Sequence, residues 1–273
     1  MQTLTRPPAA GAAARRLTTA EKQQFAERGY VKNLPMFDEA GVAALQTRFD
    51  ELLARVPDGE DINSRNNWHK ANRWCYDLCQ TPAIHDYVED LLGPDLIHWG
   101  CQFFCKLPGA SSEVPWHQDS QYWPLTPRTS VTLWLALYDT DDTNGAMRVV
   151  AASHRADYQH HTVEGDQYTL AQAIDEQQFD PADIVTIDLK AGEASIHDDD
   201  LVHGSGPSES GRRRVGMTLR FSPTDVRCDV EEWPFFEAYL VRGTDRFQHN
   251  PVGKVPSGDA IPTARFQPSS DFP

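Results

Sequence analysis

Apolar residues recur with a helical period in the first third of the chain and with a strand-like period after it. Between residues 38 and 53 they occupy every third or fourth position, which predicts an amphipathic helix. Thr18 and Glu21 form a capping-box pattern, and Gly29 would end the helix that starts there. A further helix is expected over residues 82–92. The front of the chain is therefore predicted to be largely helical.

Behind this front, short apolar runs are separated by turn-forming pairs such as Asn144-Gly145. Many short strands behind helices predict an antiparallel barrel or sandwich that the helices buttress. A polar insert over residues 168–178 is expected to be helical, and residues 250–273 are expected to form loop. The predicted strands cover residues 97–107, 129–138, 146–150, 184–189, 194–197 and 214–222.

The organisation along the chain predicts one folded domain behind a short tail. Residues 1–16 are rich in Ala, Pro and Arg and lack a leucine-rich apolar run, which indicates a disordered tail and not a signal peptide. Residues 17–273 then form one domain, with a helical front at about 17–93, a barrel core at about 96–227 and a C-terminal extension at 228–273.

The net charge limits which binding partners are expected, and the cysteine content indicates the cellular compartment. The 273 residues carry a formal net charge of -15, which disfavours nucleic acid and anionic membranes as partners and leaves a small molecule. No apolar run approaches the roughly 18 residues that a membrane span needs. Five cysteines without a signal peptide indicate reduced thiols in the cytoplasm. Two C-x3-C spacings leave a zinc site open, with buried free thiols as the alternative. The oligomeric state stays open.

The candidate chemistry begins with Trp116-His117-Gln118-Asp119. In an extended strand His117 and Asp119 would point to the same face, so both could reach one metal ion. His203, far downstream, would complete a set of two histidines and one carboxylate. That set leaves coordination positions open and is typical of non-haem Fe(II) oxygenases, which use O2. A His-x-Asp pair alone is common, so the fold must bring His203 to it.

Oxygenases with these ligands usually need an electron donor such as 2-oxoglutarate, whose far carboxylate requires a cation. Arg214 follows His203 by eleven residues and lies in an apolar pattern, so it is the expected anchor. Ser205 could donate a second hydrogen bond to the same carboxylate. Arg212 and Arg213 are expected to be solvated.

Two long stretches resemble the phytanoyl-CoA dioxygenase family. One reads W-H-Q-D-S-Q-Y-W-P at its start and N-G-A-M-R-V-V-A-A-S-H-R at its end, and the other reads L-V-H-G-S-G-P-S-E-S-G-R-R-R-V-G-M-T-L-R-F-S-P-T-D-V-R. The resemblance implies a double-stranded β-helix, a jelly-roll or cupin-like barrel, and Fe(II)/2-oxoglutarate oxygenase activity. It makes His117, Asp119 and His203 the iron ligands and Arg214, with Ser205 beside it, the 2-oxoglutarate anchor.

The same resemblance assigns further residues around the cavity. Trp134 matches a tryptophan near the co-substrate, and Gln102 is a candidate for the pocket wall. Trp123 falls where ectoine hydroxylases contact substrate, and Tyr122 beside it would help to shield the reaction. Asp119 stands where related halogenases have a small residue, which favours hydroxylation over halogenation.

Three consecutive acidic residues, Asp198 to Asp200, depart from the histidine and glycine that the family often has before the distal histidine. They form either a solvated acidic turn or, through Asp198, a contact to a cationic group of the substrate. No basic cluster suits the phosphates of CoA. We therefore expect hydroxylation of a small polar or zwitterionic metabolite or biosynthetic intermediate, with release of succinate and CO2.

Two other functions fit the same pattern. A cupin-like metal dioxygenase could use the barrel and the metal without 2-oxoglutarate. A barrel without catalysis could bind a small ligand, although the complete ligand set and Arg214 argue against it. A zinc hydrolase is disfavoured because no evident general base accompanies the ligands.

Overall fold

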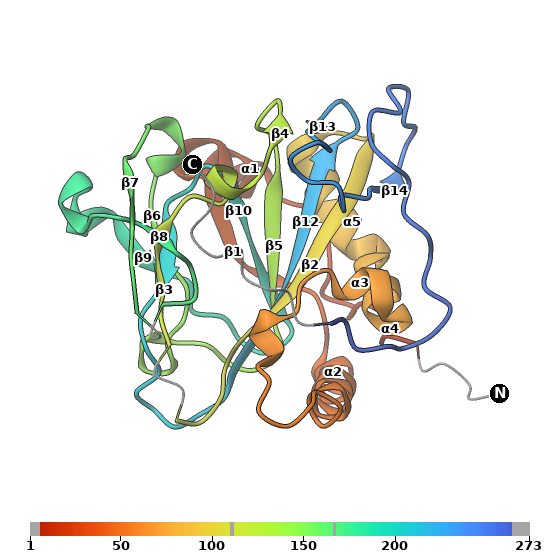
Figure 1. Cartoon of the computed structure of the whole chain (residues 1–273), viewed down its shortest axis with the longest axis horizontal. Helices are drawn as coiled ribbons and strands as arrows, with labels where there is room; N and C mark the ends of the chain where they lie inside the picture. Colours follow the sequence, from red (N-terminus) through yellow and green to blue (C-terminus); the bar gives the residue numbers. More distant parts are fainter. Residues whose placement is uncertain (1–5, 110–111, 166–167, 264–273) are drawn as a thin grey trace.

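Two antiparallel sheets, flanked by helices, make up the structure (Figure 1). It is a computed structural model, and it describes residues 6–109, 112–165 and 168–263. The larger sheet has the strand order β1-β10-β5-β12-β2-β14, and the smaller one the order β3-β11-β6-β9. The larger sheet comprises β1 (Tyr30–Pro35), β10 (Glu193–Asp198), β5 (Val131–Ala136), β12 (Arg214–Pro223), β2 (Leu96–Lys106) and β14 (Tyr239–Arg242); the smaller comprises β3 (Val114–His117), β11 (His203–Ser205), β6 (Arg148–Val150) and β9 (Ile184–Thr186).

Two short pairs of strands complete the β-structure. They are β4 (Leu125–Thr126) with β13 (Arg227–Cys228), and β7 (His160–Thr162) with β8 (Gln172–Ile174). The second pair occupies part of the insert for which a helix was predicted, so that prediction was wrong over residues 172–174. Ala173 and Ile174 are buried there, and pairing with β7 satisfies the backbone that a helix would otherwise satisfy.

The predicted helices are confirmed at their caps. Helix α1 (Thr19–Arg28) has the capping box of Thr18 and Glu21 and ends at Gly29, which adopts a φ of 79°. Helix α2 (Glu39–Leu53) begins after Asp38, whose side chain accepts from the backbone N–H of Gly41. The remaining helices are α3 (Trp68–Ala71), α4 (Arg73–Cys79) and α5 (Pro82–Leu92).

The main hydrophobic core lies between the helices and one face of the larger sheet (Figure 1). Side chains of β12 alternate between the two faces of that sheet. Val215, Met217 and Leu219 belong to this core, whereas Arg214 and Thr218 line a cavity on the other face. Because β12 is paired on both sides, with β2 and with β5, the register of these side chains is fixed by two ladders of hydrogen bonds.

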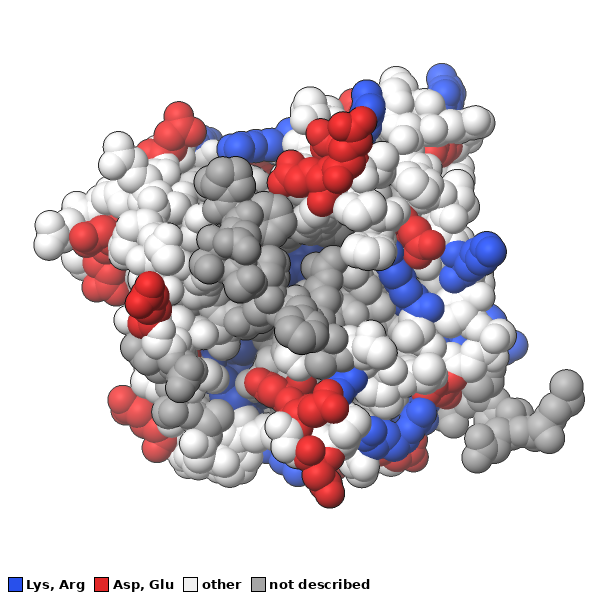
Figure 2. All heavy atoms as spheres, in the orientation of Figure 1, with Lys and Arg blue, Asp and Glu red and all other residues white. Residues whose placement is uncertain are grey.

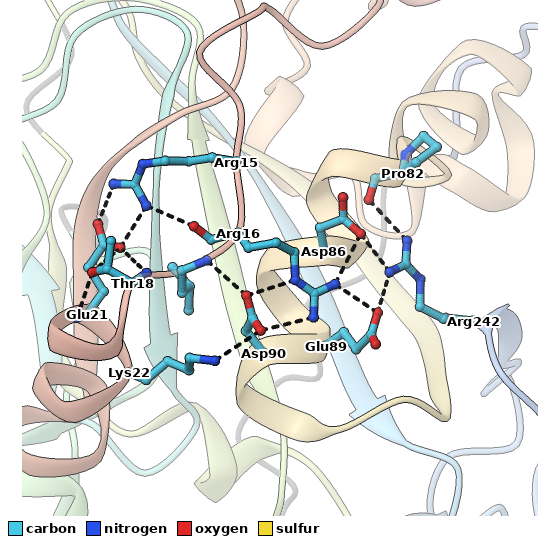
Figure 3. Close-up of polar contacts among 11 residues, drawn as sticks. Arg15, Arg16, Thr18, Glu21, Lys22, Pro82, Asp86, Glu89, Asp90 and Arg242 are labelled. Carbon is cyan, nitrogen blue, oxygen red and sulfur yellow. Dashed lines mark hydrogen bonds and ion pairs between the residues drawn. The ribbon is translucent and has the colours of Figure 1, made fainter.

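The N-terminal segment is attached to the body by ion pairs (Figure 3). Arg16 contacts three acidic side chains of α5, and Arg242 of β14 shares two of them, Asp86 and Glu89. Arg15 pairs with Glu21 of α1 at 2.7 Å. These contacts connect the described part of the expected tail, residues 6–16, to the first and last elements of the fold. Residues 1–5 of that tail, and 264–273 of the expected C-terminal loop, lie outside the described residues.

All five cysteines are buried and free. Among the residues that the structure describes, no helix is both long and apolar enough to cross a membrane.

Substitution of Phe103 would test how much the core between the sheet and the helices contributes to stability. Its ring is fully buried in edge-to-face contact with Phe49 and Trp68, at centroid distances of 5.4 and 5.0 Å. Phe103→Ala should lower the free energy of unfolding by about 3–5 kcal/mol, because it removes buried area and leaves a cavity. Urea unfolding measures this, with exposed Phe247→Ala as the control, for which a change below about 0.5 kcal/mol is expected. A similar loss for both variants would contradict this view of the core.

Candidate metal centre and its cavity

The smaller sheet places the two predicted histidine ligands side by side. His117 is the last residue of β3 and His203 the first of β11, and the two are register partners in this antiparallel pair. Their ring centroids lie 4.1 Å apart. The sequence suggested that His117 and Asp119 share one strand, and this was wrong. Strand β3 ends at His117, and a 3-10 helix (Asp119–Tyr122) begins at Asp119. One ligand atom from each of the three residues nevertheless lies within 4.8 Å of the others.

Hydrogen bonds orient all three side chains. The Nδ1 atoms of His117 and His203 lie 2.8 and 2.9 Å from the backbone carbonyls of Pro115 and Leu201. A carbonyl only accepts, so each Nδ1 carries the proton and donates, which leaves each Nε2 with a free lone pair. Thr132 donates to Oδ2 of Asp119 at 3.1 Å. Supporting bonds of this kind fix ligand orientation in metal sites.

The protonation states suit a cation. Burial, together with neighbouring imidazoles, holds the pKa of His203 well below its usual value, so the ring is neutral. Burial opposes ionisation of Asp119, whereas the hydrogen bond that Thr132 donates to its Oδ2 favours the ionised carboxylate. Neutral imidazoles and an ionised carboxylate are the forms that bind metal. The residues present therefore fit a divalent metal with two nitrogen ligands and one oxygen ligand.

His197 of β10 is a fourth group at this centre, which the sequence reasoning missed. It is 1% exposed, its ring lies 4.5 Å from that of His203, and its Nε2 lies 3.8 Å from Oδ2 of Asp119. Neither ring nitrogen has a hydrogen-bond partner among the described residues. The alternation of β10, in which Ser195 and His197 share a face, was the available signal.

Arg214, the predicted co-substrate anchor, lines the same cavity as the three candidate metal ligands. It is 3% exposed, and its guanidinium lies over the ring of Trp134 at 4.9 Å. A Cβ at Gly216, two residues beyond Arg214 on β12, would lie 1.8 Å from that ring, so the glycine makes room for it. Burial lowers the pKa of Arg214 to about 10, which still leaves it charged near neutral pH.

Lys106 is a second cation next to Arg214 and was not predicted. It is the register partner of Arg214 on β2 and is 2% exposed. Its Nζ donates to Oγ of Ser205 at 2.8 Å and to the backbone carbonyls of Ser205 and Gly206. Burial and Arg214 lower its pKa to about 7. Among the described residues neither cation has an ion pair with a carboxylate, so this part of the cavity suits an anion.

The remaining candidate residues lie around this centre but do not line the cavity. Gln102 donates to the carbonyl of Asn63, and Trp123 packs edge-to-face on Trp99 at 4.7 Å. Tyr122 lies 5.9 Å from the ring of His117. The substrate roles of Trp123 and Tyr122, and the pocket role of Gln102, stay predictions. Arg212 and Arg213 lie at the surface, paired with Asp141 and Asp50.

The three acidic residues after His197 form a compact cluster. Asp198 accepts from the backbone N–H of Asp200, which in turn accepts from Ser120. The cluster does not face the cavity, so the role of Asp198 in substrate binding also stays a prediction. Asp199 is 2% exposed, and burial next to two carboxyls raises its pKa to about 8.

Asp199→Asn should therefore stabilise the protein at alkaline pH. The folded chain keeps a proton on Asp199 that the unfolded chain releases near pH 4, so this residue lowers stability as pH rises from about 4 to 8. At pH 8 we expect the variant to gain at least about 1 kcal/mol, or about 2 °C in Tm, and to gain nothing at pH 4. Thermal unfolding at both values measures this. An equal gain at both would contradict a buried neutral carboxyl.

The sequence matches one known protein family and several of its members. The model of the family described as "Phytanoyl-CoA dioxygenase (PhyH)" matches residues 25–216. A probable alpha-ketoglutarate-dependent hypophosphite dioxygenase from Stutzerimonas stutzeri is 27% identical over 61% of this chain and 59% of its own length. The peroxisomal phytanoyl-CoA dioxygenase of Bos taurus is 28% identical over 79% of this chain and 72% of its own. The chain thus spans about three fifths of the first of these relatives.

Solved structures agree on the fold. The non-heme monooxygenase ThoJ superposes with a TM-score of 0.72 at 27% identity, covering 87% of this chain and 89% of its own. CytC3 with Fe(II) and alpha-ketoglutarate superposes with a TM-score of 0.65 at 20% identity, covering 92% and 98%. The jelly-roll predicted from the sequence is thereby confirmed. With the family model covering most of its length, this chain belongs to the phytanoyl-CoA dioxygenase family.

Proposed function

We propose that this protein is an Fe(II)- and 2-oxoglutarate-dependent dioxygenase that hydroxylates a C–H bond of a small polar or zwitterionic metabolite. One observation carries the proposal: a buried set of two histidines and one carboxylate shares a cavity with a buried arginine that has no acidic partner among the described residues. The overall reaction consumes O2 and 2-oxoglutarate, gives succinate and CO2, and converts C–H to C–OH. The name of the Stutzerimonas relative supports the same co-substrate.

His117, Asp119 and His203 would hold the iron. When bound, iron supplies the activation of O2 that organic side chains cannot provide. The protein contributes ligand orientation, through the carbonyls behind the histidines and the hydroxyl of Thr132 behind Asp119. Asp119 would fill a coordination position of the iron that a small residue would leave free for a halide. Its presence supports hydroxylation over halogenation.

Arg214 and Lys106 would bind the distal carboxylate of 2-oxoglutarate. Stacking on Trp134 fixes the plane of the guanidinium, so it can offer two parallel N–H donors to a carboxylate. Ser205 already accepts from Lys106, which leaves its hydroxyl proton free to donate to the same carboxylate. A cupin-like dioxygenase that does not use 2-oxoglutarate would have no need for two buried cations here, and this favours the 2-oxoglutarate-dependent reaction.

Replacing a ligand should abolish turnover. His117→Ala and Asp119→Ala should each lower release of labelled CO2 from 2-oxoglutarate by at least about 1,000-fold and weaken Fe(II) binding, because only two ligands remain. A metabolite panel with Fe(II), 2-oxoglutarate and O2, scored by mass spectrometry for addition of one oxygen atom, supplies the substrate-dependent assay. Exposed Asp188→Asn is the matched control and should behave as wild type. Turnover in either ligand variant would refute the metal assignment.

The two cations make separate, measurable contributions to co-substrate binding. Arg214→Ala should raise the KM for 2-oxoglutarate about 10- to 100-fold, since a charge-assisted hydrogen bond contributes about 1.5–3 kcal/mol. Lys106→Met should raise it less, because the ammonium also bonds to the backbone around Ser205. Steady-state kinetics with varied 2-oxoglutarate measures both. An unchanged KM in both variants would show that the anion binds elsewhere.

A further inference from the structure

Arg220 lies on the cavity face of β12, six residues beyond Arg214. Positions an even number apart on a strand share a face, and six residues span about 20 Å. The register partners of Arg220 are Gly100 on β2 and Thr132 on β5, and Thr132 is the residue that donates to Asp119. Arg220 therefore starts from β12 next to the Thr132–Asp119 contact, whereas Arg214 starts from a distant point of the same strand.

The fold makes specific room for this side chain. A Cβ at Gly100 would lie 3.0 Å from Cδ of Arg220, so the glycine leaves space for the arginine stem. The guanidinium lies over the ring of Trp123 at 5.1 Å. Trp123 is itself fixed by Trp99 in the aromatic cluster beside the C-terminal extension. This packing resembles that of Arg214 on Trp134 at the opposite end of the cavity.

Arg220 has no acidic partner of its own. In the described parts of the chain it forms no ion pair, and its buried Nε has no acceptor. Asp119 acts on it electrostatically, but the oxygens of that carboxylate already contact His117, His197 and Thr132. Arg220 is only partly buried whereas its strand neighbours are buried, and it lines the cavity.

The balance of charge in the cavity leaves room for one more anion. Two arginines, Arg214 and Arg220, line the cavity with one carboxylate, Asp119, so its lining side chains carry an excess of one positive charge. Lys106, bonded to Ser205 behind this lining, adds a second when it is protonated. Fe(II) and the 2-oxoglutarate dianion cancel each other. Figure 2 shows basic atoms inside the hollow of this face and acidic side chains near its rim. An unneutralised charge out of bulk water is costly, which favours an anionic ligand.

We propose that Arg220 binds an anionic group of the substrate, a carboxylate or a phosphorus oxyanion that presents two oxygens to the guanidinium. The substrate would lie between Arg220 and the metal ligands, with 2-oxoglutarate on the side of Arg214. This inference rests on the proposed function and names the substrate class for the same site. A zwitterion satisfies it through its acidic end.

Calorimetry on the intact chain loaded with Fe(II) and saturating 2-oxoglutarate without O2 tests this. The probes are four small molecules of similar size: butanoate, propylphosphonate, butanamide and butylammonium. We expect wild type to bind at least one of the two anions at least tenfold more tightly than the amide or the amine. The preferred anion distinguishes a carboxylate substrate from a phosphorus oxyanion. Equal binding of charged and neutral probes by wild type would overturn the proposal without any variant.

Variants then assign the preference to the residue. Arg220→Gln should remove the preference for the anion and leave the affinities for Fe(II) and 2-oxoglutarate within about twofold of wild type, and Arg220→Lys should keep part of the preference. Arg212→Gln, which removes an equal charge at the surface, is the control and should change none of these. An anion preference that survives in Arg220→Gln, or a matching loss of 2-oxoglutarate binding there, would refute the role. Failure of wild type to bind Fe(II) or 2-oxoglutarate would instead refute the proposed function.

Discussion

The alternation of side chains along β12 is the constraint on which both the core and the cavity depend. One face of the strand packs Val215, Met217 and Leu219 against the helices, and the other presents two arginines to the cavity. Neighbouring strands pair with β12 on both sides, so a shift by one residue would move charges into the core and apolar groups into the cavity. Correct folding of the core thereby fixes the geometry of the site.

The cavity holds its cations at a cost that a ligand would offset. Arg214 and Lys106 are nearly inaccessible to solvent, and burial lowers the pKa of both. Backbone carbonyls and an aromatic face compensate them in part. Groups held in this way are already oriented when an anion arrives, so binding requires little rearrangement. Apolar residues of similar size would stabilise the free protein more than these buried charges do. Binding of an anion would explain why the charges are present.

Local signals in the sequence were enough to predict most helices and strands and to pick out three residues that could bind a metal, whereas they could not predict which strands pair. The caps of α1 and α2 and the alternation of β12 depend on neighbouring residues, and these predictions were confirmed. Lys106 was missed because only the register of β2 with β12 places it opposite Arg214. The alternation of β10 could indicate the face on which His197 lies, but the pairing of β10 with β5 is what brings it to Asp119. Strands β1 and β14 at the sheet edges were also missed.

The location of the three candidate ligands has a mechanical consequence. His117 and His203 belong to the small sheet, whereas Asp119 is hydrogen-bonded to Thr132 of the large one. A metal ion bound to all three would therefore act as a cross-link between the two sheets. β11 has three residues and β3 has four, so these short strands contribute few backbone bonds of their own. Loss of the ion would let this side of the barrel open first, and protease resistance of the loops around β3 and β11 would follow metal occupancy.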